Sequence, residues 1–290
     1  MSKTNSAPST NFLNDLKRKG AIVIEIQPHA KGFLNYSRKG FYKIALVTGK
    51  ALVNQAHEKI HLDGTYLRFS TPYIPYSSEV LSEKWEGYAC YFLEEFLYPG
   101  HRVSIIQKTP LFKIGAAPAV KLTVEQKDKI ASIFQNMLHE QSSNYKFKND
   151  VLRSHINLLI HESIKIDDTL NFKPYQKAPI RITSRFFDLL EEQFPVVSPL
   201  KPIKLVSASD FAECISVHVN YLNRMVKDTT GKTTSHLIAE RIIKEAVALL
   251  KQTDWTISEI ALALGFIQSN YFSSFFKRHI GQTPQEYRRE

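Results

Sequence analysis

Hydrophobic positions in the first third of the chain occur in short runs that turn residues separate. The runs are rich in β-branched and aromatic residues, which favours the strands of an antiparallel sheet or a barrel. The predicted strands cover residues 21–26, 42–48, 51–54, 66–69, 87–92 and 103–106. Gly49-Lys50 is predicted to be a turn between two of them.

After residue 117 the hydrophobic spacing changes to that of helices. Residues 127–140 carry apolar side chains at i, i+3, i+4, i+7 and i+8, which predicts an amphipathic helix. Residues 149–163 predict a second one. Their apolar stripes could pack against the strands of the same chain or against a second copy in a homodimer, and the pattern does not choose between the two.

The polar stretch 167–177 contains Pro174 and predicts a linker. We therefore expect three parts, with boundaries at 1–166 for a first domain, 167–180 for a linker and 181–290 for a second domain.

The second domain contains an internal repeat. The segments 220–222 and 231–233 recur as 270–272 and 281–283, at an offset of 50 residues. Upstream, Ala212 pairs with Ala261 at an offset of 49, so the second copy has one additional residue in its turn. One supersecondary unit has been used twice.

Each copy is predicted to be a helix, a tight turn and a second helix. In the second copy, Thr256-Ile-Ser-Glu259 is a capping box and Gly265 ends the first helix. Phe266-Ile267 is expected to return to the core, and Gln268-Ser269-Asn270 to cap the next helix. A long helix over 235–253 separates the copies and spans roughly 28 Å, close to the ~34 Å of one turn of B-DNA.

Polar and cationic side chains fall on the outer face of the second helix in each copy. Asn can pair with adenine, Arg with guanine, and Lys or Arg with phosphate. The candidate DNA-binding residues are Asn220, Asn223, Arg224, Lys227, Gln268, Ser269, Asn270, Ser274, Lys277 and Arg278. Plain helical bundles also contain such turns, but two polar second helices at a fixed offset favour DNA binding.

The segment 257–288 resembles the AraC/XylS family of bacterial transcription regulators. The motifs that carry the resemblance are Ile260-Ala261, Gly265-Phe266, Ser269-Asn270-Tyr271-Phe272, Phe275-Phe276-Lys277-Arg278, Gly281, Thr283-Pro284 and Glu286-Tyr287-Arg288. The first copy matches more loosely, with Ser216 in its turn and Val226 where the family often has Phe. The stretch 196–206 looks like an insertion longer than usual.

The resemblance implies an α+β multidomain protein, with an N-terminal cupin-like β-barrel flanked by helices and an all-α C-terminal domain with two helix-turn-helix units. It implies an activator or a repressor that binds double-stranded promoter DNA in two successive major grooves. RNA polymerase, a homodimer partner and a small-molecule effector bound to the barrel are its candidate partners. No cofactor and no enzymatic activity are expected.

Composition excludes some classes of protein but does not indicate a function. The net charge is +10, and most of the basic excess lies in the N-terminal part, so charge alone does not argue for DNA binding. The two cysteines form no CxxC pair, which argues against a disulfide framework or a usual zinc site. The N-terminus lacks the apolar region of a signal peptide and no apolar stretch is long enough to span a membrane, so we expect a cytoplasmic protein.

An enzyme is the alternative, either a small-molecule-binding or a metal-dependent one of cupin type with a helical assembly domain. His57-Glu58-Lys59-Ile60-His61 matches the letters of a zinc motif, and His29 lies upstream. That motif requires a helix, whereas this segment predicts a hairpin or loop, so no metal site is expected. Eight aromatic residues could line a ligand pocket or fill the core: Phe33, Tyr36, Phe41, Tyr42, Tyr66, Phe69, Tyr73 and Tyr76.

Overall fold

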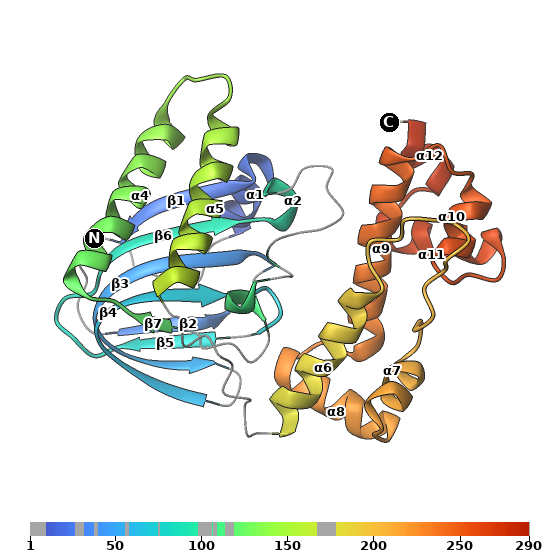
Figure 1. The fold of residues 1–290 in the computed structure, drawn as a ribbon, viewed down its shortest axis with the longest axis horizontal. Coiled ribbons are helices and arrows are strands. Elements are labelled where there is room, and N and C mark those ends of the chain that lie inside the picture. The colour runs from blue at the N-terminus through green and yellow to red at the C-terminus, as the bar shows by residue number, and fades with distance from the viewer. Residues whose placement is uncertain are drawn as a thin grey trace. The chain divides into compact units, whose positions relative to one another are not determined.

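A computed structural model describes residues 10–26, 32–37, 40–55, 58–74, 76–97, 106, 109–113, 119–166 and 178–289 (Figure 1). The described residues up to 166 form one compact unit, and those from 178 form a second. The predicted linker over 167–177 lies outside the described residues, and residues 178–180 already belong to a helix. No helix in the described part of the chain is long and apolar enough to cross a membrane.

The first unit is an antiparallel sheet with helices on it. Its strands are β1 (Ala21–Ile26), β2 (Gly32–Ser37), β3 (Tyr42–Gln55), β4 (Glu58–Ser70), β5 (Tyr76–Val80), β6 (Glu86–Phe92) and β7 (Ala119–Lys121). Its helices are α1 (Thr10–Lys19), α2 (Glu94–Leu97), the 3-10 turn Pro110–Phe112, α4 (Val124–Ser142) and α5 (Lys148–Ile166).

The main strand order is β1-β6-β3-β4-β7, and β5 joins β2 to β3. The antiparallel sheet that the sequence predicted is present, but its described strands do not close on themselves, so a cupin barrel is not confirmed. Residues 103–105 of the last predicted strand lie outside the described part.

Gly49 is where the sequence prediction of a turn was wrong. β3 runs without interruption from Tyr42 to Gln55, and β4 pairs with it from Lys43 to Gln55. On its other edge, β3 pairs with β6 up to Thr48 and with β5 from Ala51. The strand therefore changes neighbours at Gly49, whose φ of 143° suits glycine.

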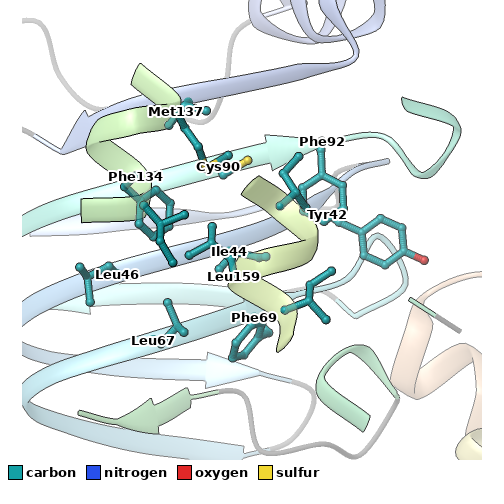
Figure 2. Close-up of a cluster of buried hydrophobic side chains, with 14 of the residues drawn as sticks. Tyr42, Ile44, Leu46, Leu67, Phe69, Cys90, Phe92, Phe134, Met137 and Leu159 are labelled. Carbon is teal, nitrogen blue, oxygen red and sulfur yellow. The ribbon is translucent and has the colours of Figure 1, made fainter. Parts of the chain in front are cut away.

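The two predicted helices pack on the sheet of their own chain. Their apolar stripes and one face of β1, β3, β4 and β6 form a single core (Figure 2). From α4, Ile130, Phe134 and Met137 are buried in it, and from α5, Ile156 and Leu159 are. Burial against the sheet, rather than against a second copy, therefore accounts for these stripes.

The second unit consists of helices that pack around α9. They are α6 (Ala178–Glu192), α7 (Ala208–Ile215), α8 (Val219–Thr230), α9 (Thr234–Gln252), α10 (Ile257–Ala263), α11 (Ser269–Ile280) and α12 (Pro284–Arg289). α9 contacts α8, α10 and α12, while α6 contacts α7 and α8.

The stretch 196–206 is held by polar contacts to α9 and to the end of α10. Buried Arg241 of α9 pairs with Glu191 and Glu245, and the other Glu245 oxygen accepts a hydrogen bond from the Val196 amide at 2.8 Å. Farther along, the Ile203 amide donates to the Ala263 carbonyl at 3.0 Å. This stretch thus connects α9 with the end of α10.

Gly49→Ala is expected to destabilise the first unit by about 2 kcal/mol. The added Cβ would lie 2.6 Å from the Lys84 carbonyl oxygen and 2.7 Å from Ser82 Oγ, at a positive φ. Urea unfolding followed by the fluorescence of buried Trp85, in a Trp255→Phe background, measures the loss.

Gly40→Ala is the matched control, because a Cβ there has no atom within 4 Å. If the two variants had equal stability, the prediction that Gly49 is closely packed where β3 changes neighbours would be wrong.

Candidate nucleic-acid interface

The two predicted helix-turn-helix units have the same turn geometry. In the first, α7 ends at Ser216, which has φ 60°; in the second, α10 is followed by Gly265, with φ 80°. The Val217 amide donates to the Ala212 carbonyl at 3.0 Å, and the Phe266 amide donates to the Ala261 carbonyl at 2.9 Å. The repeat seen in the sequence is thus a repeat of backbone structure.

The second helices also begin and end alike. α8 starts three residues after Ser216 and α11 four residues after Gly265, which places the additional residue of the second copy in its turn. Both helices end at a left-handed glycine, Gly231 and Gly281, whose amide donates to the carbonyl four residues earlier. Capped helices follow each glycine, opened by Thr233 and by the Thr283–Glu286 capping box.

The candidate DNA-binding residues lie on the face of α8 and α11 that is turned away from the core. Leu222 and Val226 of α8 and Phe272 and Phe276 of α11 are fully buried, as the stripe predicted. Eight of the ten candidates are exposed, and Asn223 and Ser269 are half-buried. In its first two turns, the part that enters a major groove, α8 therefore presents amide and cationic groups and α11 presents amide and hydroxyl groups.

Aromatic rings support the arginines on this face. The Arg224 guanidinium lies 5.5 Å from the centre of the Tyr221 ring, and that of Arg278 lies 6.0 Å from the Phe275 ring. Such contacts restrict a long side chain while leaving its N–H groups free to bind oxygen acceptors.

The N-terminus of α11 differs from the sequence prediction in two respects. Ile267 does not return to the core, because it occupies the additional turn residue, and it is 93% exposed. Gln268 stands at the N-cap but its side chain makes no capping hydrogen bond. Asn270 Oδ1 instead accepts from the neighbouring Tyr271 amide at 2.9 Å.

Sequence reasoning missed the apolar part of this surface. Ile267 and Tyr271, the latter 60% exposed, flank the polar residues at the start of α11. Such apolar side chains suit contact with thymine methyl groups or sugars. Both residues are apolar but lie outside the buried stripe of α11, and this mismatch was visible in the sequence.

The described part of the metal motif lacks the helix that such a zinc site requires. Glu58–His61 lies in strand β4 rather than in a helix, and His61 is exposed. His29 and His57 lie outside the described residues. Among the residues that the structure describes, no cluster of three or more His, Cys, Asp or Glu could hold a metal ion.

A family model described as a helix-turn-helix domain matches residues 211–290. The HTH-type transcriptional activator RhaR of Enterobacter sp. (strain 638) is 39% identical over 67 residues, which are 23% of this chain and 24% of that protein. RhaR of Yersinia pseudotuberculosis serotype O:1b (strain IP 31758) is 35% identical over 80 residues, 28% of each. The chain thus covers about a quarter of the length of these relatives.

Residues 211–290 form a helix-turn-helix domain. Among solved structures, an AraC-type transcriptional regulator from Chromobacterium violaceum is 29% identical, with a TM-score of 0.31 over 37% of this chain and 88% of that one. Wild-type ToxT from Vibrio cholerae strain SCE256, solved with an unsaturated fatty acid, is 17% identical, with a TM-score of 0.35 over 92% and 94%.

Substitutions in the two turns of the helix-turn-helix domain are expected to change its stability in opposite directions. Ser216→Gly should stabilise the domain by up to about 1 kcal/mol, because a left-handed conformation costs a side-chain-bearing residue more than glycine. Gly265→Ala should destabilise it by about 1–2 kcal/mol, since its Cβ would lie 2.6 Å from Val206 Cγ1 at a positive φ. Thermal unfolding of the full chain measures both.

Ser216→Ala is the control for the hydroxyl, and we expect it to match the wild type. If Ser216→Gly were no more stable than Ser216→Ala, the left-handed backbone at residue 216 would not limit the stability of the domain.

Proposed function

We propose that this protein is a sequence-specific transcription regulator that binds promoter DNA through α8 and α11. The observation that carries the proposal is the repeated surface: two helices on the same backbone turn, each with its polar and cationic residues exposed. The match of residues 211–290 to a helix-turn-helix family model supports it.

The connecting helix has a length that suits two groove contacts. α9 contains 19 residues and so spans roughly 28 Å, close to one turn of B-DNA. In this proposal α8 and α11 enter successive major grooves on one side of the duplex. Asn220, Asn223 and Arg224 contact bases in one, and Ser269, Asn270 and Ser274 in the other.

Phosphate contacts and the remaining partners complete the proposal. Lys227, Lys277 and Arg278 lie at the later turns of the two helices, where they can neutralise the DNA backbone. Because the curated relatives are named as activators, we propose activation, with RNA polymerase as the partner. The N-terminal unit, a cupin-like domain in this proposal, senses a small molecule and dimerises.

Capture of genomic DNA fragments by the full-length protein at near-physiological salt tests the proposal. A shared motif with two half-sites about 10 base pairs apart is the expected result. Binding without any motif would contradict sequence-specific regulation, and repetition with residues 178–290 would show whether the N-terminal unit holds the domain inactive.

Arg224→Ala and Asn270→Ala should each weaken binding to that motif by about 1–3 kcal/mol and relax base preference, because each removes one bidentate base contact. Lys227→Ala and Lys277→Ala should instead weaken binding to all sequences and lower the slope of log K against log salt by about 1 each. Fluorescence anisotropy over a salt series measures these effects.

Arg181→Ala is the matched control, since Arg181 is exposed on α6, outside the two second helices. An Arg224→Ala variant with the affinity and selectivity of Arg181→Ala would remove Arg224 from the base-contacting set.

A further inference from the structure

Arg68 is a buried cation that lacks a counter-charge among the described residues. It lies in β4 with only 5% of its surface exposed. Its Nη1 donates to Ser78 Oγ at 3.1 Å, while its buried Nε and Nη2 have no hydrogen-bond partner in the part of the chain that the structure describes. Buried polar groups are nearly always paired, and an unpaired buried charge is strongly destabilising. A guanidinium in this state needs an explanation.

The face of the sheet around Arg68 is cationic and aromatic. This is the face opposite the α4–α5 core, and it carries Tyr76 and Lys43. The Arg68 guanidinium lies 5.7 Å from the centre of the Tyr76 ring, and Lys43 Nζ lies 5.8 Å from that ring and 5.2 Å from the Tyr91 ring. The two positive charges thus share the Tyr76 ring.

Nothing in the described part of the chain neutralises these two charges. Neither Arg68 nor Lys43 forms an ion pair with a described carboxylate. Burial lowers the pKa of the Arg68 guanidinium and raises the pKa of the Tyr76 hydroxyl. Because arginine stays protonated in proteins and a raised pKa keeps tyrosine neutral, both are hydrogen-bond donors at neutral pH.

Small residues are paired with Arg68 in the sheet. The two residues that pair with Arg68 across the sheet are Ala45 on β3 and Ala119 on β7, and Ala45 is itself paired with Ala89 on β6. Val47 and Trp85 lie in the same apolar cluster as Ala45 and Ala89. The surroundings of Arg68 are therefore apolar apart from its hydroxyl and cationic neighbours.

The two unpaired nitrogens of Arg68 indicate which kind of acceptor group would bind there. Nε–H and Nη2–H are the two parallel donors on one side of a guanidinium, and they match the two oxygens of a carboxylate in a bidentate pair. Apolar and aromatic neighbours suit the hydrocarbon body of an organic acid better than a fully hydrated inorganic ion.

We propose that this face of the N-terminal sheet binds a small organic acid, with Arg68 as the principal ligand of its carboxylate and Lys43 in support. The proposal names the chemical class of the effector in the proposed sensor function and depends on that function for its regulatory consequence. The binding itself can be measured without DNA.

Thermal unfolding and calorimetric titration of the full-length protein with benzoate and octanoate, in a chloride-free buffer, test the proposal. At saturating concentration either acid should raise the Tm by about 2–4 °C. Benzamide and octanamide, which keep the apolar body but lack the charge, should not. Inorganic phosphate tests whether the acidic group is a carboxylate or a phosphate. If phosphate alone gave an Arg68-dependent rise in Tm, the anion site would be supported and its ligand would be a phosphate ester.

Arg68→Met should abolish the shift and leave the Tm without ligand unchanged or higher, since it removes a buried unpaired charge at similar volume. Lys59→Met, an exposed cation on the same strand, is the matched control and should keep the full shift. Arg68→Lys should keep a weaker one.

Two results would overturn the proposal. One is the absence of an Arg68-dependent shift with both carboxylates and with phosphate. The other is a loss of Tm in Arg68→Met without ligand together with an unchanged response to the acids, which would make Arg68 a structural residue. DNA capture by Arg68→Met is a separate readout, so failure of the anion site and failure of the regulator proposal are distinguishable.

Discussion

The left-handed residue between the two helices of each helix-turn-helix unit is the constraint on which the proposed DNA-binding surface depends. Ser216 and Gly265 reverse the chain within one residue, so that the next amide returns to a carbonyl of the helix just ended. This fixes the direction in which α8 and α11 begin. The buried Leu222 and Val226, or Phe272 and Phe276, then determine which side of each helix faces outward.

The N-terminal unit divides its sheet between two environments. One face is covered by α4 and α5 and has a continuous apolar core (Figure 2). The other has a smaller apolar cluster and, in the same strands, Arg68 with its tyrosines and without a described counter-charge. Natural proteins retain a destabilising group of this kind chiefly at functional sites. The contrast between the two faces therefore separates the structural role of this unit from its proposed sensing role.

Much of the C-terminal domain could be predicted, because its signals are local. A helix repeats its apolar side chains every three to four residues, and its caps and its terminal glycine are adjacent in sequence. Thr256, Gly265 and the offset of the two copies were therefore sufficient to predict α10 and α11. The same periodicity predicted α4 and α5, although it left open what they pack against.

Strands were predicted less well, because their partners are distant in sequence. Gly49 resembled a turn, yet it is the point where one long strand exchanges β6 for β5. Ile267 resembled a core residue, yet it is almost fully exposed.

The sequence by itself determined the repeat, the helices and the candidate DNA-binding residues, since hydrogen bonds within a helix and its turns involve only near neighbours. Only the tertiary structure decided the burial of Arg68 and the exposure of Ile267. Burial is a property of all the segments that meet at a point, and alternation along a strand shows which residues share a face but not which face is covered.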